Sequence, residues 1–197
     1  MRAIVGNLSE AEPPRDRALL DQCLGGDDEA WRLLCRRQYS TVANTLRKLG
    51  VEDEEVEDAA QDVFIEVFRY LPSFRGESQL STWLYRLCIS CAHQVRKRAR
   101  TRERLRRFLL LAPVQTAPQQ LGFGEAQARQ KIERALSALS EKQRAVFVLY
   151  ELENVPGKQI AEILSCPEAT VWRRLHEARR SFMAAMDDLS RARRNGP

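Results

Sequence analysis

The sequence predicts an all-α fold of two helical domains joined by a flexible linker. Apolar residues recur at steps of three and four along nearly the whole chain, which is the spacing of one face of an α-helix. Capping and helix-breaking residues stand at the ends of these segments, and the alternation typical of β-strands is missing. A stretch rich in proline, glycine and glutamine, and poor in charged residues, divides the 197 residues into two parts.

This linker sets the predicted domain limits. We expect an N-terminal extension over 1–21, a first domain over 22–107, the linker over 108–127, a second domain over 128–190 and a tail over 191–197. The first linker residues, Phe108–Leu111, are unusually apolar. They either cover one of the domains, which is the simpler interpretation, or contact a partner.

Two helices are the clearest elements of the first domain. The earlier one ends before Pro72, and a tight loop over 74–78 leads to the next. The apolar positions of the earlier helix are Val56, Ala59, Ala60, Val63, Phe64, Val67 and Phe68. Its polar positions, expected to face water, are Glu57, Asp58, Gln61, Asp62 and Glu66. The later helix has its apolar stripe at Leu80, Trp83, Leu84, Leu87 and Cys91.

The second domain opens with a helix whose apolar residues are Ile132, Leu136 and Leu139. Ser140–Gln143 then fits a capping box, in which the serine accepts a backbone hydrogen bond and the glutamine reaches back. Pro156–Gly157 breaks the following helical segment.

Residues 156–182 follow the pattern of a helix-turn-helix. In the turn, Ser165 stands where such motifs usually prefer glycine, and Pro167 suits the start of the second helix. The inner stripe of that helix is Val171, Leu175, Ala178 and Phe182. Its outward faces carry Thr170, Trp172, Arg173, Arg174, His176, Glu177, Arg179 and Arg180. An arginine-bearing helix fits the major groove of DNA, so the pattern favours DNA binding, although the same shape also occurs in proteins that bind no DNA.

The net charge of +5 is unevenly distributed along the chain. Residues 27–72 carry −5, residues 73–107 carry +8 and residues 166–197 carry +3, whereas residues 108–165 are neutral. Two basic segments favour two surfaces for one polyanion, and the acidic segment favours a different partner.

Several function classes are disfavoured. The longest apolar run, 108–114, is far shorter than the ~20 residues of a membrane span, and residues 1–9 lack the apolar stretch of a signal peptide. Five cysteines, an odd number, indicate reduced thiols, so we expect a cytoplasmic protein without membrane insertion. With two histidines and no glycine-rich phosphate loop, an enzyme is disfavoured and no cofactor is expected.

Cys88, Cys91 and His93 raise the question of a zinc site. The two cysteines could share a helix face, but His93 would lie about 160° from the midpoint of that pair. A structural zinc ion needs four ligands, and no fourth is nearby. We therefore expect no metal site and interpret the cysteines as small apolar helix residues.

The order of these motifs resembles a known family. Its segments are Asp58–Phe64, Phe74–Ser78, Ser81–Arg86, the linker, Ala138–Phe147 and the helix-turn-helix ending at Arg174–Arg179. Together they resemble the bacterial sigma-70 family of RNA polymerase sigma factors, in its extracytoplasmic-function (ECF) branch, which keeps only sigma regions 2 and 4. The resemblance covers about 27–107 and 130–183.

The resemblance implies binding to core RNA polymerase and promoter DNA. Asp58, Gln61 and Asp62 share one helix face and match residues that, in the family, dock on a coiled coil of the largest polymerase subunit. In isolation, such a trio would be a solvated acidic face. An anti-sigma factor is a further partner that the resemblance admits.

The resemblance assigns recognition of the −10 element to region 2. The residues it implies are Arg75, Ser78, Gln79, Trp83, Arg86, Arg96, Lys97, Arg98 and Arg100. Residues 76–81 match the loop that, in the family, captures a flipped-out base of the −10 element. Trp83 matches an aromatic residue that lies near the place where the DNA duplex opens, although the helical phase of Trp83 fits a core position equally well. The basic run is expected to contact phosphates, which give affinity without sequence information.

The resemblance assigns the −35 element to region 4. The implied residues are the outward set on the second helix of the motif, Thr170, Trp172, Arg173, Arg174, His176, Glu177, Arg179 and Arg180. Two departures from the family pattern mean that base contacts cannot be carried over directly to this sequence. In region 2, Ser90 stands where many relatives have asparagine, and in region 4, Trp172 stands at a position that relatives often use to contact DNA.

Two other functions fit parts of the sequence. A stand-alone helix-turn-helix regulator would bind an operator tightly by itself and would give no role to the acidic face at Asp58. A helical adaptor whose basic run binds RNA would show no promoter-dependent transcription.

Overall fold

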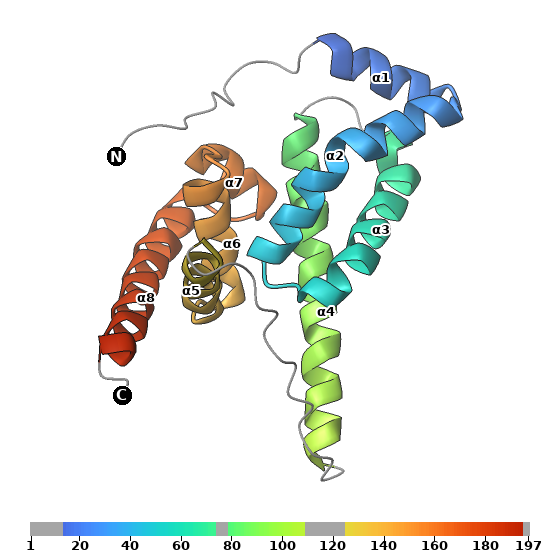
Figure 1. The fold of residues 1–197 in the computed structure, drawn as a ribbon. Helices are drawn as coiled ribbons and strands as arrows, with labels where there is room; N and C mark the ends of the chain where they lie inside the picture. The colour runs from blue at the N-terminus through green and yellow to red at the C-terminus, as the bar shows by residue number, and fades with distance from the viewer. Residues whose placement is uncertain (1–13, 74–78, 109–124, 195–197) are drawn as a thin grey trace.

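The computed structural model describes residues 14–73, 79–108 and 125–194 (Figure 1). The helices are α1 (Pro14–Leu24), α2 (Asp28–Lys48), α3 (Asp53–Tyr70), the short η1 (Leu71–Ser73), α4 (Leu80–Phe108), α5 (Glu125–Ser137), α6 (Glu141–Phe147), the π-helical η2 (Val148–Leu152), α7 (Gly157–Ile163) and α8 (Glu168–Arg194). No β-strand occurs in these ranges, so the predicted all-α class is confirmed. None of these helices is long and apolar enough to cross a membrane.

Helices α2, α3 and α4 form the first bundle, and α1 packs on α2. Helix α2 begins at a carboxylate cap, because Asp27 Oδ1 accepts hydrogen bonds from the backbone N–H groups of Glu29 and Ala30 at 2.8 and 3.2 Å. The core between the helices includes the fully buried side chains Val42, Leu46, Val56, Val63, Val67 and Leu71. This bundle presents α3 and α4 side by side.

Helices α5 to α8 form the second bundle. The predicted capping box is present: Ser140 Oγ accepts from the N–H of Gln143 at 3.4 Å, and Gln143 Oε1 accepts from the N–H of Ser140 at 3.0 Å. The second core includes Val146, Leu149, Ile160, Val171 and Leu175. The apolar stripe expected along the last helix is inside, with Val171, Leu175 and Ala178 buried and Phe182 half-buried.

The helix-turn-helix has the predicted geometry. Ser165 takes a left-handed backbone conformation with a φ of 48°, which explains why glycine is preferred at this position. The N–H of Cys166 bonds to the carbonyl oxygen of Ala161 at 3.0 Å and closes the turn. Helix α8 then starts at Glu168, directly after Pro167, and continues to Arg194.

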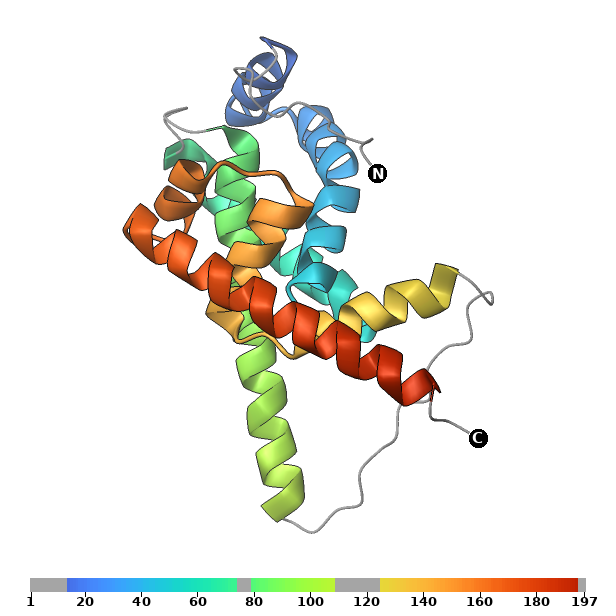
Figure 2. The same ribbon diagram turned by 90° about the vertical axis from the view of Figure 1, so that its left-hand side faces the viewer.

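The two bundles pack against each other. Ala145 and Val148 of the second bundle belong to the apolar core of the first, and Tyr85 of α4 belongs to the core of the second. Figures 1 and 2 show α6 and α7 lying against the N-terminal half of α4, whose C-terminal half projects beyond the bundles. The segment of the predicted linker at 109–124 lies outside the described residues.

Two apolar residues differ from their expected burial. Phe68 is 64% exposed and Ile132 is 42% exposed, although the helical pattern placed both on core-facing stripes. Phe68 stands near the end of α3, where its ring packs at a tilt of 50° against Trp31 of α2, with ring centroids 4.9 Å apart. Its exposure therefore reflects the edge of the bundle, where no further helix of the described chain covers it.

The capping box gives a first prediction. Ser140→Ala is expected to lower the free energy of unfolding by about 1 kcal/mol, because the N–H of Gln143 loses its side-chain acceptor. The measurement is urea denaturation followed by circular dichroism. The control is Ser137→Ala, which removes an exposed hydroxyl that donates to the carbonyl oxygen of Arg134, and it is expected to change the unfolding free energy by less than about 0.5 kcal/mol. Equal losses in the two variants would contradict the prediction.

Candidate functional site

The residues expected to dock on polymerase lie on one exposed face of α3. Asp58, Gln61 and Asp62 are all exposed, while Ala60 and Val63 of the same helix are buried. The spacing of three and four residues puts the trio on adjacent turns of one face. This face can therefore be contacted without any change in the core.

A groove of about 710 Å³ runs between α3 and α4. One wall is acidic, with Glu55, Asp58 and Asp62 of α3, and the other is basic, with Lys97, Arg98 and Arg102 of α4. Glu55 and Arg102 form an ion pair across the groove. The acidic and basic surfaces that the sequence presented as separate segments thus line a single groove.

The residues expected at the −10 element fall into four groups. Arg75 and Ser78 lie outside the described residues. Lys97 and Arg98 are exposed on α4, whereas Gln79 and Trp83 are half-buried at its start. The remaining three, Arg86, Arg96 and Arg100, contact other parts of the protein.

Arg86 and Arg96 donate hydrogen bonds to backbone carbonyl groups. Arg86 Nη2 donates to the carbonyl oxygen of Glu162 in α7 at 3.1 Å, and Arg96 Nη1 donates to that of Leu49 at 3.3 Å. Burial lowers the pKa of the half-buried Arg96 from its usual value. These two arginines therefore help to fix α4 to its neighbours.

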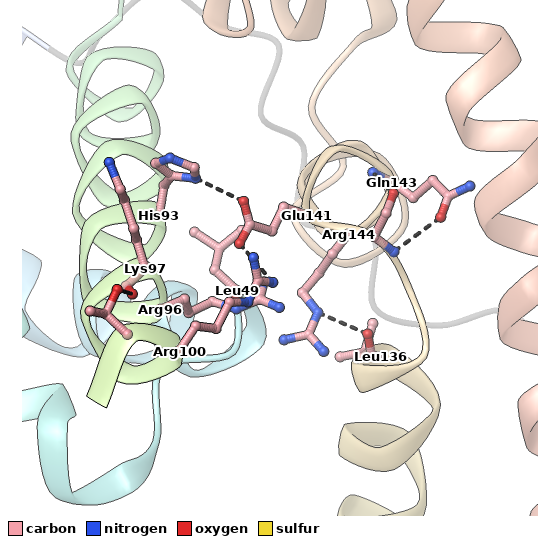
Figure 3. Close-up of polar contacts among 11 residues, drawn as sticks. Leu49, His93, Arg96, Lys97, Arg100, Leu136, Glu141, Gln143 and Arg144 are labelled. Atoms are coloured by element: carbon pink, nitrogen blue, oxygen red, sulfur yellow. Dashed lines mark hydrogen bonds and ion pairs between the residues drawn. The ribbon is translucent and has the colours of Figure 1, made fainter. Parts of the chain in front are cut away.

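Glu141 at the start of α6 contacts two side chains of α4 (Figure 3). Its Oε2 lies 2.7 Å from His93 Nδ1, and its Oε1 lies 2.9 Å from Arg100 Nη2. Burial alone would raise the pKa of Glu141, but the hydrogen bond from His93 and the charges of Arg100 and Arg96 bring it below the usual value. Glu141 is thus held as a carboxylate against the basic helix.

Arg144, one turn further along α6, is buried with only 4% of its surface exposed. Its Nε donates to the carbonyl oxygen of Leu136 at 2.8 Å (Figure 3). Its guanidinium covers Gly50 in the turn between α2 and α3. A Cβ at position 50 would lie only 1.7 Å from Arg144 Nη1, so glycine is required for this approach. Burial lowers the pKa of Arg144 to about 10.

Helix α8 presents most of the residues expected at the −35 element. Trp172, Arg173, His176, Arg179 and Arg180 are exposed. Thr170, Arg174 and Glu177 are half-buried.

Four of these side chains form ion pairs or hydrogen bonds that hold them on the second bundle, and Trp172 is a fifth with partners there. Arg173 pairs with Glu177 at 2.8 Å, Arg179 pairs with Glu151 at 2.6 Å, and Arg174 Nη1 lies 3.7 Å from Cys166 Sγ. The hydrogen bond from Arg173 lowers the pKa of Glu177, which also accepts from Gln143 at 3.4 Å. Glu177 therefore positions Arg173 along the outer face of α8.

Trp172 packs the helix-turn-helix together. Its ring meets that of Tyr150 edge to face, with centroids 5.4 Å apart, and its Nε1 donates to Glu168 at 3.1 Å. A Cβ on Gly157 would lie 2.5 Å from the indole ring, so α7 begins in direct contact with it. The sequence pattern, which placed Trp172 among outward residues, did not reveal this packing role.

The residues considered for zinc do not converge. Cys88 is buried, Cys91 Sγ lies 3.4 Å from the carbonyl oxygen of Ala59, and His93 is exposed and bound to Glu141. Burial raises the pKa of Cys88 to about 12 and that of Cys91 to about 11, so both are thiols at neutral pH.

Comparison with known proteins supplies the family. The family model described as Sigma-70 region 2 matches residues 34–104, and the one described as Sigma-70, region 4 matches residues 129–182. The chain is 30% identical over 192 residues to the ECF RNA polymerase sigma-E factor of Escherichia coli strain K12, covering 92% of this chain and 99% of that protein. It is 31% identical over 180 residues to the protein of the same name from Haemophilus influenzae, covering 86% and 94%.

Solved structures share the fold. CnrH, in complex with the cytosolic domain of CnrY, aligns with a TM-score of 0.66 at 20% identity, covering 88% of this chain and 97% of that one. The sigma factor RpoE of Bartonella quintana, in complex with the anti-sigma factor NepR, aligns with a TM-score of 0.58 at 22% identity, covering 75% and 91%. Both sigma regions match family models, and the sigma-E relatives align over nearly their whole length. The chain therefore belongs to the sigma-70 family, as an RNA polymerase sigma factor of the ECF type.

Proposed function

We propose that three surfaces of this sigma factor divide the work of promoter recognition. The face of Asp58, Gln61 and Asp62 on α3 docks on the coiled coil of the largest polymerase subunit, α4 binds the −10 element, and α8 binds the −35 element. The observation that carries this proposal is the exposed polar face of α3, next to the basic α4. The protein performs no catalytic step itself and acts in the cytoplasm, where polymerase and promoter DNA lie.

The basic wall of α4 supplies the phosphate contacts in this proposal. Lys97 and Arg98 are exposed and adjacent, and Arg102 follows one turn later. Cations that neutralise DNA phosphates release counterions, so binding weakens steeply with salt and carries no base preference. Base preference at the −10 element would come from residues at the start of α4, including Gln79, Trp83 and Arg86.

The outer face of α8 supplies base contacts at the −35 element. Arg173 and His176 are exposed one turn apart, opposite the buried Val171 and Leu175. An arginine that is already extended along the helix surface by Glu177 has less conformational freedom to lose on binding a guanine edge.

The salt dependence of promoter binding tests the role of α4. In the holoenzyme, the double variant Lys97→Gln, Arg98→Gln is expected to reduce the slope of log K against log salt by about 1 to 2, because up to two phosphate contacts are lost. Binding should weaken equally on different promoter sequences. Arg32→Gln, Arg36→Gln removes two exposed cations from α2 and is expected to leave the slope unchanged. An unchanged slope for the α4 variant would assign Lys97 and Arg98 to a merely solvated surface.

Run-off transcription tests the function as a whole. Purified core polymerase with this protein is expected to transcribe a subset of a genomic fragment library that core alone does not transcribe. A stand-alone regulator would instead bind such fragments tightly without core. An RNA-binding adaptor would give no promoter-dependent transcript.

An anti-sigma factor is a further partner in this proposal. It is supported by the RpoE structure, which holds one. Co-purification of a protein that blocks the run-off activity is the expected result.

A further inference from the structure

Trp172 stands near the start of the helix proposed to bind the −35 element. Helix α8 begins at Glu168, and the second helix of a helix-turn-helix enters the major groove with its N-terminal residues. Trp172 is 43% exposed, and the exposed His176 follows one turn later on the same face. A large aromatic side chain is thus presented among the residues proposed to contact bases.

The indole ring of Trp172 is fixed by contacts within region 4. Its atoms Cζ2, Cη2 and Cε2 lie against Gly157, at 2.5, 2.8 and 3.2 Å from the place where a Cβ would stand. Tyr150 meets the ring edge to face and is itself covered by the guanidinium of Arg179, 5.5 Å from its centroid. Nε1 donates to Glu168 at 3.1 Å. Because the ring is held before DNA arrives, it loses little conformational freedom on binding.

The same contacts decide what the ring can offer to DNA. Tryptophan has one polar side-chain atom, Nε1, which donates and cannot accept a hydrogen bond. That N–H is already bonded to Glu168. The rest of the side chain is carbon, so Trp172 cannot form the paired hydrogen bonds with which arginine reads guanine. The apolar group that distinguishes base pairs in the major groove is the 5-methyl group of thymine.

We propose that Trp172 is a specificity-determining residue of region 4, and that its indole packs against the 5-methyl group of a pyrimidine in the −35 element. The base is thymine, or 5-methylcytosine in methylated DNA, since both carry this methyl group. Gly157 gives the ring its space and Glu168 holds its N–H, so both are positioning residues. The inference rests on the proposed role of α8 and adds to it the class of base that one −35 position holds.

A purely structural role for Trp172 predicts a different result. If the ring only packed the helix-turn-helix together, its loss would destabilise region 4 and weaken binding to every −35 sequence by the same factor. Loss of a methyl contact instead changes binding at one base, and only when that base carries the methyl group. The two roles are therefore separated by a ratio of affinities measured on two DNA duplexes that differ by a single methyl group.

Deoxyuridine in place of thymine removes the methyl group and leaves the base-pairing edge unchanged. The experiment titrates holoenzyme against a labelled duplex of a promoter selected by run-off transcription, with each thymine of the −35 element replaced in turn on either strand. One replacement is expected to weaken wild-type binding roughly fourfold, as for one methyl group removed from a buried contact. At that position, 5-methylcytosine binding more tightly than cytosine would assign the methyl group alone, and equal binding would assign thymine.

Variants of the protein assign this sensitivity to Trp172. The Trp172→Ala holoenzyme is expected to bind the thymine and deoxyuridine duplexes equally well. Phe182→Ala is the matched control, because it removes another aromatic of α8, stacked on Phe147 with centroids 4.7 Å apart. It is expected to keep the wild-type ratio, whatever its effect on stability. A Trp172→Ala holoenzyme that also keeps this ratio at every thymine would overturn the proposal.

Gly157→Ala decides the matter where Trp172→Ala does not fold, because it leaves the tryptophan in the chain. Gly157 is not among the glycines with positive φ, so alanine suits its backbone, but the new Cβ must displace the indole. The ratio for the sensitive thymine is expected to fall towards one. An unchanged ratio in Gly157→Ala would overturn the placement of the ring that the proposal requires.

Failure of the proposed function would look different. If exchange of whole base pairs in the −35 element left holoenzyme binding unchanged, region 4 would not read that element at all. Wild-type binding that responds to base-pair exchange, but not to deoxyuridine at any thymine of the element, would reject this inference alone.

Discussion

Reversing the acidic face of α3 is expected to abolish binding to core polymerase while leaving the protein folded. The variant is Asp58→Arg with Gln61→Ala and Asp62→Arg. All three side chains are exposed, so their replacement should change the free energy of unfolding by no more than about 1 kcal/mol. At the docked interface, the new arginines would face the cations of the partner, and the lost amide would leave a partner group unpaired. Transcription should fall to the level of core alone.

The measurement is a titration of labelled protein with core polymerase, together with helicity and melting temperature. Glu57→Arg is the matched control for Asp58→Arg, because Glu57 is also exposed but is turned about 100° around the helix. It is expected to bind core nearly as well as the wild type. Near-normal affinity of the triple variant would contradict the docking face and would favour a free-standing DNA-binding protein.

Local features of the fold could be predicted because they depend on neighbouring residues. The apolar spacing of α3, the capping box at Ser140 and the turn at Ser165 each follow from interactions within a few positions of the chain. The order of these motifs was also enough to indicate the family, which the matches to regions 2 and 4 confirm.

Contacts between the regions could not be predicted in the same way. Lys48 and Glu153 are 105 positions apart, and Arg86 and Glu162 are 76 apart. No periodic pattern encodes such pairs, because they depend on how two folded bundles meet. Tyr85 illustrates the point: it lies outside the stripe identified on its helix, yet it is buried against the other region.

In the candidate site, too, some features could be predicted from the sequence and others depended on how the helices pack. Charge alone indicated an acidic and a basic segment, and the exposure of Asp58, Gln61 and Asp62 follows the helical pattern. That the two charged walls line one groove, and that Glu55 reaches Arg102 across it, needed the packing angle of α3 on α4. The packing of Trp172 on Tyr150 and Gly157 likewise depends on three segments that meet only in the folded bundle.

Recognition of the −35 element is expected to change when the outer face of α8 is altered. Arg173→Ala and His176→Ala remove exposed side chains one turn apart, on the side of the helix opposite the buried Val171 and Leu175. Each lost base contact should cost about 1–3 kcal/mol at particular −35 positions and leave others unaffected. Because both residues are on the surface, the stability of region 4 should change by no more than about 0.5 kcal/mol.

The measurement is transcription by each variant holoenzyme from a library in which the −35 positions are randomised. Arg191→Ala is the matched control, since Arg191 is exposed on the same helix but stands roughly 27 Å further along its axis from Arg173. Glu177→Gln separates base contact from positioning: a preference altered in the same way as in Arg173→Ala would show that Glu177 acts by holding the arginine in place. If Arg173→Ala and His176→Ala both reproduce the wild-type preference at every position, α8 does not read the −35 element through this face, and the helix-turn-helix must approach DNA in another orientation.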